Sequence, residues 1–167
     1  MNKRNIILIG MPGAGKSSVG VILAKVLGYE FIDTDLVIQH RETRLLREII
    51  ADEGNEGFLA IENEVNATLE ADKSVIAPGG SAIYGKEAME HFKEIGIIVY
   101  LKLSYEDLAK RLGNLKGRGV VLKEGQTLKD LYDERSKLYE QYAEITVDES
   151  GKDIQGTILA LREQIGM

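Results

Sequence analysis

The chain has 167 residues with a net charge of −6, no cysteine, 44% hydrophobic residues and only 6% aromatic ones. This size and balance predict one globular domain with a mainly aliphatic core. The acidic charge argues against general nucleic-acid binding, because phosphate backbones would be repelled, and the lack of cysteine excludes disulfide bonds and a thiol nucleophile. The first apolar run, residues 6–9, is too short for a signal-peptide core or a membrane span, so we expect a cytoplasmic protein with no membrane partner.

Short apolar runs of strand length recur along the chain, and longer stretches of helical periodicity separate them. Val19, Leu23 and Val26 follow such a helical spacing. Strands that alternate with helices predict crossover units, and hence an α/β fold with a mainly parallel sheet and helices on both faces. The expected strands are residues 5–9, 30–32, 74–77, 97–101 and 145–147.

Two regions interrupt this alternation within the expected single domain, residues 1–167. Residues 36–71 show helical patterns without a convincing strand, which favours a helical substrate-binding subdomain. Residues 113–125 carry four glycines among charged residues. Such a composition is typical of a mobile lid and equally of an ordinary surface loop.

A complete phosphate-loop motif, G-x-x-x-x-G-K-[ST], occupies residues 10–17 (GMPGAGKS). It follows a predicted strand and precedes a predicted helix, which is the context that the motif requires. Its glycines allow backbone N–H groups to approach phosphate oxygens, while Lys16 supplies a charge to the β- and γ-phosphates and Ser17 a hydroxyl ligand to Mg²⁺. The motif specifies nucleotide binding and leaves the reaction open. The nucleotide-binding residues predicted here are Gly13, Ala14, Gly15, Lys16, Ser17 and Ser18.

Two aspartates, Asp33 and Asp35, follow the second predicted strand, at the edge where open α/β sheets bind ligands. Residues two apart on an extended segment point the same way, so both carboxylates would face the phosphates, one towards the metal ion and one towards the acceptor hydroxyl. The alternative is an aspartate that caps the next helix. Gly79 and Gly80, after the third strand, either let a ligand approach the backbone or form a plain turn.

Six motifs, in their order and spacing over nearly the whole chain, resemble those of the shikimate kinase family. They are GMPGAGKSSVG, FIDTD, EGNEGFLAIENE, APGGS, RLGNLKGRG and RSKLYE. The resemblance implies a P-loop NTPase fold of the nucleoside-monophosphate-kinase branch, with a five-stranded parallel sheet, a substrate subdomain and a lid. It also implies a monomeric enzyme that uses ATP and Mg²⁺ to phosphorylate shikimate, forming shikimate 3-phosphate in aromatic amino acid biosynthesis.

The resemblance further implies roles for individual residues. Asp33 would help to hold Mg²⁺, and Asp35 would bind and orient the acceptor hydroxyl. Arg118 in the lid would close over the phosphates, Arg111 would stack on adenine, and Arg135 would bind the substrate carboxylate. These roles suit phosphoryl transfer, which depends on positioning and charge neutralisation; the alternative for Arg111 and Arg135 is a solvated helix face. The implied catalytic residues are Lys16, Asp35 and Arg118, and the implied acceptor-binding residues are Asp35, Gly79, Gly80 and Arg135.

The chain departs from the family pattern in the acceptor half. Leu59 stands where the family usually has an arginine that grips the shikimate carboxylate together with Arg135. The loss of one such charge-assisted contact is worth about 1.5–3 kcal/mol. Arg44 or Arg47, from a neighbouring helix, is a candidate replacement. 

Three further positions in this half differ from the family: Ser81 replaces the third glycine of a G-G-G motif, Pro78 a threonine, and Thr43 a glycine. The reaction type is therefore better defined than the acceptor. One alternative is a related kinase of a different small hydroxy acid, sugar acid or nucleoside monophosphate. Another is a nucleotide-binding switch without metabolite turnover, but the chain lacks the guanine-reading N-K-x-D motif expected of a GTP-dependent switch.

Overall fold

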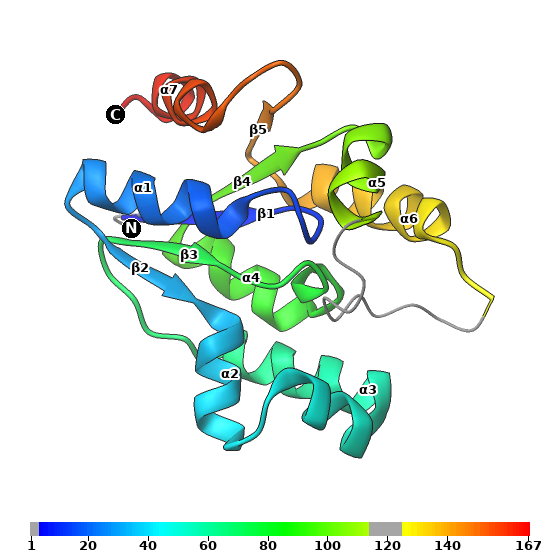
Figure 1. The fold of residues 1–167 in the computed structure, drawn as a ribbon. Helices are drawn as coiled ribbons and strands as arrows, with labels where there is room; N and C mark the ends of the chain where they lie inside the picture. The colour runs from blue at the N-terminus through cyan, green and yellow to red at the C-terminus, as the bar shows by residue number, and fades with distance from the viewer. Residues whose placement is uncertain (1–3, 114–124) are drawn as a thin grey trace.

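The computed structural model describes residues 4–113 and 125–167. In this part of the chain, one parallel sheet of five strands lies between layers of helices, as Figure 1 shows. The strand order is β2-β3-β1-β4-β5, so the predicted α/β fold with a five-stranded parallel sheet is confirmed. The strands are β1 (Asn5–Ile9), β2 (Glu30–Asp33), β3 (Ser74–Ala77), β4 (Gly96–Lys102) and β5 (Ile145–Asp148).

Helices cover both faces of the sheet. One face carries α1 (Lys16–Leu27) and α7 (Ile154–Ile165), and the other carries α4 (Lys86–Ile95), α5 (Tyr105–Gly113) and α6 (Leu128–Tyr142). A short 3₁₀ turn, η1 (Ala82–Tyr84), precedes α4. The remaining helices, α2 (Thr34–Glu42) and α3 (Leu46–Ala67), project beyond the end of β2, at the bottom of Figure 1.

The central strand β1 explains why the core has two halves. All five of its residues are buried, with side chains alternating between the two faces of the sheet. Ile6 and Leu8 pack with residues of α1 and α7, whereas Ile7 and Ile9 pack with residues of α4, α5 and α6. Burial of each large aliphatic side chain contributes about 1.5–3 kcal/mol. The phosphate loop therefore follows a strand that is packed on both faces.

Helices α2 and α3 occupy the region 36–71, which the sequence predicts to be helical, and they share a small apolar cluster of their own around Ile38, Ile49 and Phe58. Helix α3 is interrupted at Gly54, where a φ of 75° and a ψ of 176° are not helical. Glycine adopts such a conformation without the strain that a Cβ would cause. The interruption lets both halves of α3 contribute residues to one pocket.

The expected lid, residues 113–125, falls mainly on residues 114–124, so the lid and Arg118 lie outside the described residues. Within the residues that the structure describes, no helix has both the length and the apolar character needed to cross a membrane.

Candidate active site

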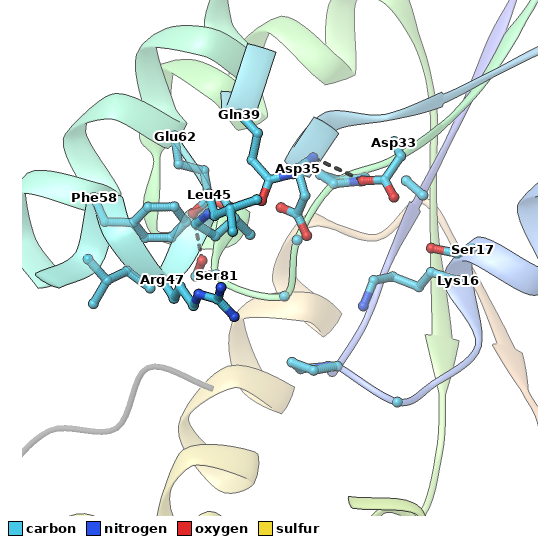
Figure 2. A pocket seen from close by; sticks show the side chains of 18 of the residues that line it. Lys16, Ser17, Asp33, Asp35, Gln39, Leu45, Arg47, Phe58, Glu62 and Ser81 are labelled. Carbon is cyan, nitrogen blue, oxygen red and sulfur yellow. Dashed lines mark hydrogen bonds between the residues drawn. The ribbon is translucent and has the colours of Figure 1, made fainter. Parts of the chain in front are cut away.

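A pocket of about 450 Å³ opens at the carboxyl edge of the sheet. The phosphate loop, the start of α2, both halves of α3, the segment after β3, and α6 all contribute to it (Figure 2). Ligands of open α/β sheets bind at this edge. The lining residues are Pro12, Gly13, Lys16, Ser17, Asp33, Asp35, Gln39, Leu45, Leu46, Arg47, Ile50, Phe58, Glu62, Ala77, Pro78, Gly79, Gly80, Ser81 and Arg135.

The phosphate loop is held in a shape that suits an anion. Gly13 and Gly15 have φ values of 90° and 82°, in the left-handed region that glycine adopts readily. The Lys16 amine donates hydrogen bonds to the carbonyl oxygens of Gly10 at 2.6 Å and Met11 at 2.9 Å. Burial lowers the pKa of Lys16 from its usual 10.5 to about 8, and the nearby Asp35 carboxylate opposes this decrease. Lys16 therefore remains mostly protonated at pH 7 and presents its charge to the loop.

The other phosphate-loop residues differ in their position. Ser17 lies in the first turn of α1 and lines the pocket, as Figure 2 shows. Ala14 is fully buried, so only its backbone is suited to contact a nucleotide. Ser18 is exposed on α1 and does not line the pocket. Its part in nucleotide binding stays a prediction.

Asp33 and Asp35 both line the pocket, but for a different reason from the one that the sequence suggests. The segment is not extended throughout, because α2 begins at Thr34 and places Asp35 in its first turn. Asp33 caps this helix, and its Oδ1 accepts a hydrogen bond from the Asp35 N–H at 3.0 Å. The capping alternative is therefore correct for Asp33, and the same turn directs Asp35 into the pocket.

The electrostatic setting of Asp35 follows from this position. Burial raises the pKa of its carboxyl from 3.8 to about 6; the charge of Asp33 adds to the increase, and that of Lys16 opposes it. At neutral pH the group is still mostly ionised. Asp35 can thus accept a hydrogen bond from a hydroxyl placed between it and the phosphate loop.

The side-chain oxygen atoms near the phosphate loop are suited to bind a magnesium ion. The Ser17 hydroxyl and the Asp33 carboxylate both line the pocket (Figure 2). Residues 4–113 and 125–167 contain no group of three or more His, Asp or Glu side chains that could hold a metal by themselves. Mg²⁺ in kinases commonly uses one or two protein oxygens together with phosphate oxygens and water, which matches this sparse set.

In the segment after β3, Gly79 and Gly80 allow a close approach of the backbone to neighbouring groups that a side chain would prevent. A Cβ at Gly79 would lie 2.9 Å from Asp35 Oδ1, and a Cβ at Gly80 would lie 2.7 Å from Pro12 Cδ and 2.9 Å from Arg135 Nη1. The backbone does turn here, since the Ala82 N–H donates a hydrogen bond to the Gly79 carbonyl oxygen at 3.1 Å, and it packs so closely against Asp35 and Arg135 that a Cβ would displace them. A role of the pair in ligand approach stays a prediction.

Arg135 is not on a solvated helix face. It projects from α6 into the pocket wall, is only 2% exposed, and its guanidinium lies 5.5 Å from the centre of the Tyr84 ring. Its buried Nε has no hydrogen-bond partner in the described part of the chain. A buried cation is costly unless it is paired, so this end of the pocket is suited to an anionic ligand.

Arg111, by contrast, is exposed on α5 and lies beside the loop rather than in the pocket. Its Nη1 donates a hydrogen bond to the Gly13 carbonyl oxygen at 3.0 Å. A Cβ at Gly15 would lie 3.9 Å from this nitrogen and 3.9 Å from the carboxylate of Glu149. Burial raises the pKa of Glu149 to about 7, while the charge of Arg111 opposes the increase. Stacking of Arg111 on adenine stays a prediction, and no sequence motif singles out Glu149.

Glu62 is a pocket residue for which the sequence analysis proposes no role. It is 1% exposed, and its Oε1 accepts a hydrogen bond from the Ser81 hydroxyl at 2.6 Å. Its Oε2 has no partner among the described residues and would lie 3.1 Å from a Cβ at Gly79. The available signal was its spacing: Glu62 follows Phe58 by four residues on a helix, so the two share one face.

Comparisons with known proteins agree with this geometry. A family model described as "Shikimate kinase" matches residues 12–165. A shikimate kinase of Vibrio cholerae is 37% identical over 168 residues, which cover 97% of each chain. A "Shikimate kinase 2" of Yersinia enterocolitica is 34% identical over 87% of this chain and 86% of its own. The chain belongs to the shikimate kinase family. Family membership makes ATP the co-substrate.

Solved structures of the shikimate kinase family share the fold. The structure of shikimate kinase from Acinetobacter baumannii in complex with shikimate is 35% identical, with a TM-score of 0.79 over 97% of this chain and 90% of that one. Shikimate kinase from Aquifex aeolicus is 27% identical, with a TM-score of 0.77 over 97% of this chain and 96% of its own. A thymidylate kinase from Candida albicans, at 16% identity and a TM-score of 0.61, shares only the fold.

The structure shows what surrounds the positions that depart from the shikimate kinase pattern. Thr43 ends α2 with a φ of 54°, a left-handed conformation that is less strained for the family's glycine. Ser81 supplies the hydroxyl that bonds Glu62, and Pro78 lines the pocket. Leu59 does not line it and packs with the apolar cluster of α2 and α3.

Proposed function

We propose that this protein is a shikimate kinase, which transfers the γ-phosphoryl group of ATP to a hydroxyl of shikimate and forms shikimate 3-phosphate for aromatic amino acid biosynthesis. The observation that carries this proposal is a single pocket in which the phosphate loop, Asp35 and the buried guanidinium of Arg135 meet. The loop is suited to a nucleotide, and Arg135 to an anion. Shikimate matches both requirements, because it carries ring hydroxyls and a carboxylate.

On the donor side, the chain supplies charge and fixed geometry. Lys16 keeps a proton at neutral pH, since its pKa is about 8, and its ammonium group lies within the loop that would hold the phosphates. Mg²⁺ bound beside Ser17 and Asp33 would neutralise phosphate charge. Phosphoryl transfer gains most from such preorganised positive charge, because the charge on the transferred group is spread over its oxygens.

On the acceptor side, Asp35 would accept a hydrogen bond from the reacting hydroxyl, orient it, and take its proton as the new P–O bond forms. Arg135 would bind the carboxylate at the opposite end of the ring. Gly79 and Gly80 would let Asp35 and Arg135 keep these positions, since a Cβ at either glycine would come within 2.9 Å of one of them. The acceptor is thereby held at both ends, which favours the in-line arrangement.

Several finer assignments stay predictions within this proposal. The helices α2 and α3 would form the substrate-binding subdomain, Arg111 would stack on adenine, and Arg118 in a lid would close over the phosphates. We also expect the enzyme to be a cytoplasmic monomer that requires Mg²⁺ and binds no nucleic acid.

The test is ADP release from ATP and Mg²⁺ with shikimate, measured beside a panel of hydroxy acids, sugar acids and nucleoside monophosphates. We expect turnover with shikimate at about 1–100 per second. A Lys16→Ala preparation, purified in the same way, measures the contribution of contaminating kinases. Turnover with another acceptor and none with shikimate would refute the proposed substrate while leaving the phosphotransferase assignment intact.

A further inference from the structure

Position 59 does not provide a cation to the pocket. Leu59 turns towards the apolar cluster shared by α2 and α3 and is absent from the pocket lining. The described lining contains three cations, which are Lys16, Arg47 and Arg135. Lys16 is bound to two loop carbonyls and belongs to the phosphate end. Two guanidinium groups therefore remain for the acceptor.

Arg47 and Arg44 lie three residues apart but have opposite surroundings. Arg44 forms ion pairs with Asp52 at 3.0 Å, Glu42 at 3.0 Å and Glu53 at 3.5 Å, and it does not line the pocket. Arg47 lines the pocket, and no carboxylate of the described residues pairs with it. In Figure 2 its guanidinium points into the pocket, while Lys16 reaches in from the opposite side. Arg44 is thus paired with carboxylates outside the pocket, and Arg47 is available to a ligand.

The backbone that carries Arg47 is fixed at the pocket mouth. Gln39 on α2 accepts a hydrogen bond from the Leu46 N–H at 2.9 Å, and Glu48 accepts one from the Leu45 N–H at 3.1 Å. The next turn of the helix is anchored by Ile49, which is fully buried. These contacts hold the first turn of α3 against α2, so the Arg47 side chain starts from a defined position and is free only beyond its Cβ.

We propose that Arg47 is a specificity-determining residue that binds the carboxylate of the acceptor together with Arg135, in the role that position 59 cannot fill. This inference rests on the proposed function, because it assigns the anion as the shikimate carboxylate. A carboxylate has two oxygens and about four acceptor sites, enough for two guanidinium groups. Arg135 binds from the buried wall and Arg47 from the exposed mouth. Compared with the family pattern, the second guanidinium is thus supplied by the first turn of α3 instead of by position 59 in its second half.

The expected signature is a change in KM rather than in kcat. The carboxylate lies away from the reacting hydroxyl, so its contact is the same in the ground state and the transition state. Arg47→Ala should raise the KM for shikimate about 10- to 200-fold, the range for one charge-assisted contact. The kcat and the KM for ATP should change less than about twofold. Because Arg47 is exposed, this truncation should leave the melting temperature close to that of the wild type.

The experiment compares three proteins: the wild type, Arg47→Ala and the matched control Arg44→Ala. The control removes a guanidinium from the same loop and helix start but not from the pocket, so its KM for shikimate should be unchanged. An unchanged KM in Arg47→Ala, or an equal increase in Arg44→Ala, would overturn the inference.

A second measurement separates recognition of the carboxylate from a general effect on the pocket. The wild type should have a higher kcat/KM for shikimate than for its neutral carboxamide. Arg47→Ala should lower the ratio of these two values by about the same factor by which it lowers the kcat/KM for shikimate. A preference that does not change would overturn the role of Arg47 even if KM increased. A wild type without any turnover of shikimate would instead refute the proposed function and the inference with it, so the two failures are distinguishable.

Discussion

Glu62→Gln should make the protein more stable at neutral and alkaline pH. Glu62 is 1% exposed, one oxygen accepts the Ser81 hydroxyl hydrogen, and the other has no partner among the described residues. Burial, with a smaller contribution from the charge of Asp35, raises the pKa of Glu62 from 4.5 to about 7. Glutamine keeps the acceptor for Ser81 and carries no charge at any pH.

The size and the sign of this change in stability follow from the pKa values of Glu62 in the unfolded and the folded chain. Below pH 4.5, Glu62 is protonated in both the folded and the unfolded chain and imposes no pH-dependent cost. Between 4.5 and about 7, the unfolded chain ionises while the folded one keeps its proton, so stability falls by about 1.4 kcal/mol per pH unit. Above pH 7 the loss levels off at about 3 kcal/mol. The Glu62→Gln variant lacks this loss.

The assay is urea denaturation of both proteins without ligands between pH 4 and pH 8.5. The difference in the free energy of unfolding should rise across the acid-to-neutral window by about 3 kcal/mol and then remain constant. Glu56→Gln, an exposed position on the same helix, should show no such pH-dependent difference. A difference for Glu62→Gln that stays flat within about 0.5 kcal/mol would refute the argument from burial.

Three further substitutions test separate parts of the account. Asp35→Asn should lower kcat by about 10²- to 10⁴-fold and leave ATP binding close to that of the wild type, because an amide cannot take the proton; normal kcat with lost ATP affinity in steady-state kinetics would contradict this role. Gly80→Ala should raise the KM for shikimate, because the new Cβ would lie 2.7 Å from Pro12 Cδ and 2.9 Å from Arg135 Nη1; an unchanged KM would mean that the substrate does not use this approach. Thr43→Gly should raise the free energy of unfolding by up to about 1 kcal/mol, because Thr43 has a φ of 54°; a decrease in urea denaturation would show that strain at this cap is negligible.

The architecture was predictable because the strands are short apolar runs between longer periodic stretches. β1 matches the expected residues 5–9, and β4 is one residue longer at each end than the expected 97–101. Glycine marks the phosphate-loop turns, where positive φ is required. These features are local, so they can be recognised from the amino-acid sequence alone.

The site was only partly predictable, because tertiary packing decides which side chains share a pocket. Asp33 and Asp35 reach it through a helix start at Thr34, where an extended segment was expected. The choice between Arg44 and Arg47 depends on the ion pairs that hold Arg44 outside the pocket.

The position of Glu62 depends in the same way on how α3 is arranged. The interruption of the helix at Gly54 lets its two halves line one pocket. Helical periodicity predicts a face within one helix, but not how two helical segments turn towards each other. The spacing therefore places Glu62 on the same helix face as Phe58, but it predicts neither the bond of Glu62 to Ser81 nor the pocket that the two halves of α3 share.

The most direct test of the central claim is identification of the phosphorylated product by ³¹P NMR after incubation with ATP, Mg²⁺ and shikimate. We predict one new phosphomonoester resonance, coupled to the ring proton at carbon 3, whose intensity equals the ADP formed. ADP formation without a new phosphomonoester would show hydrolysis of ATP rather than transfer and would contradict the account.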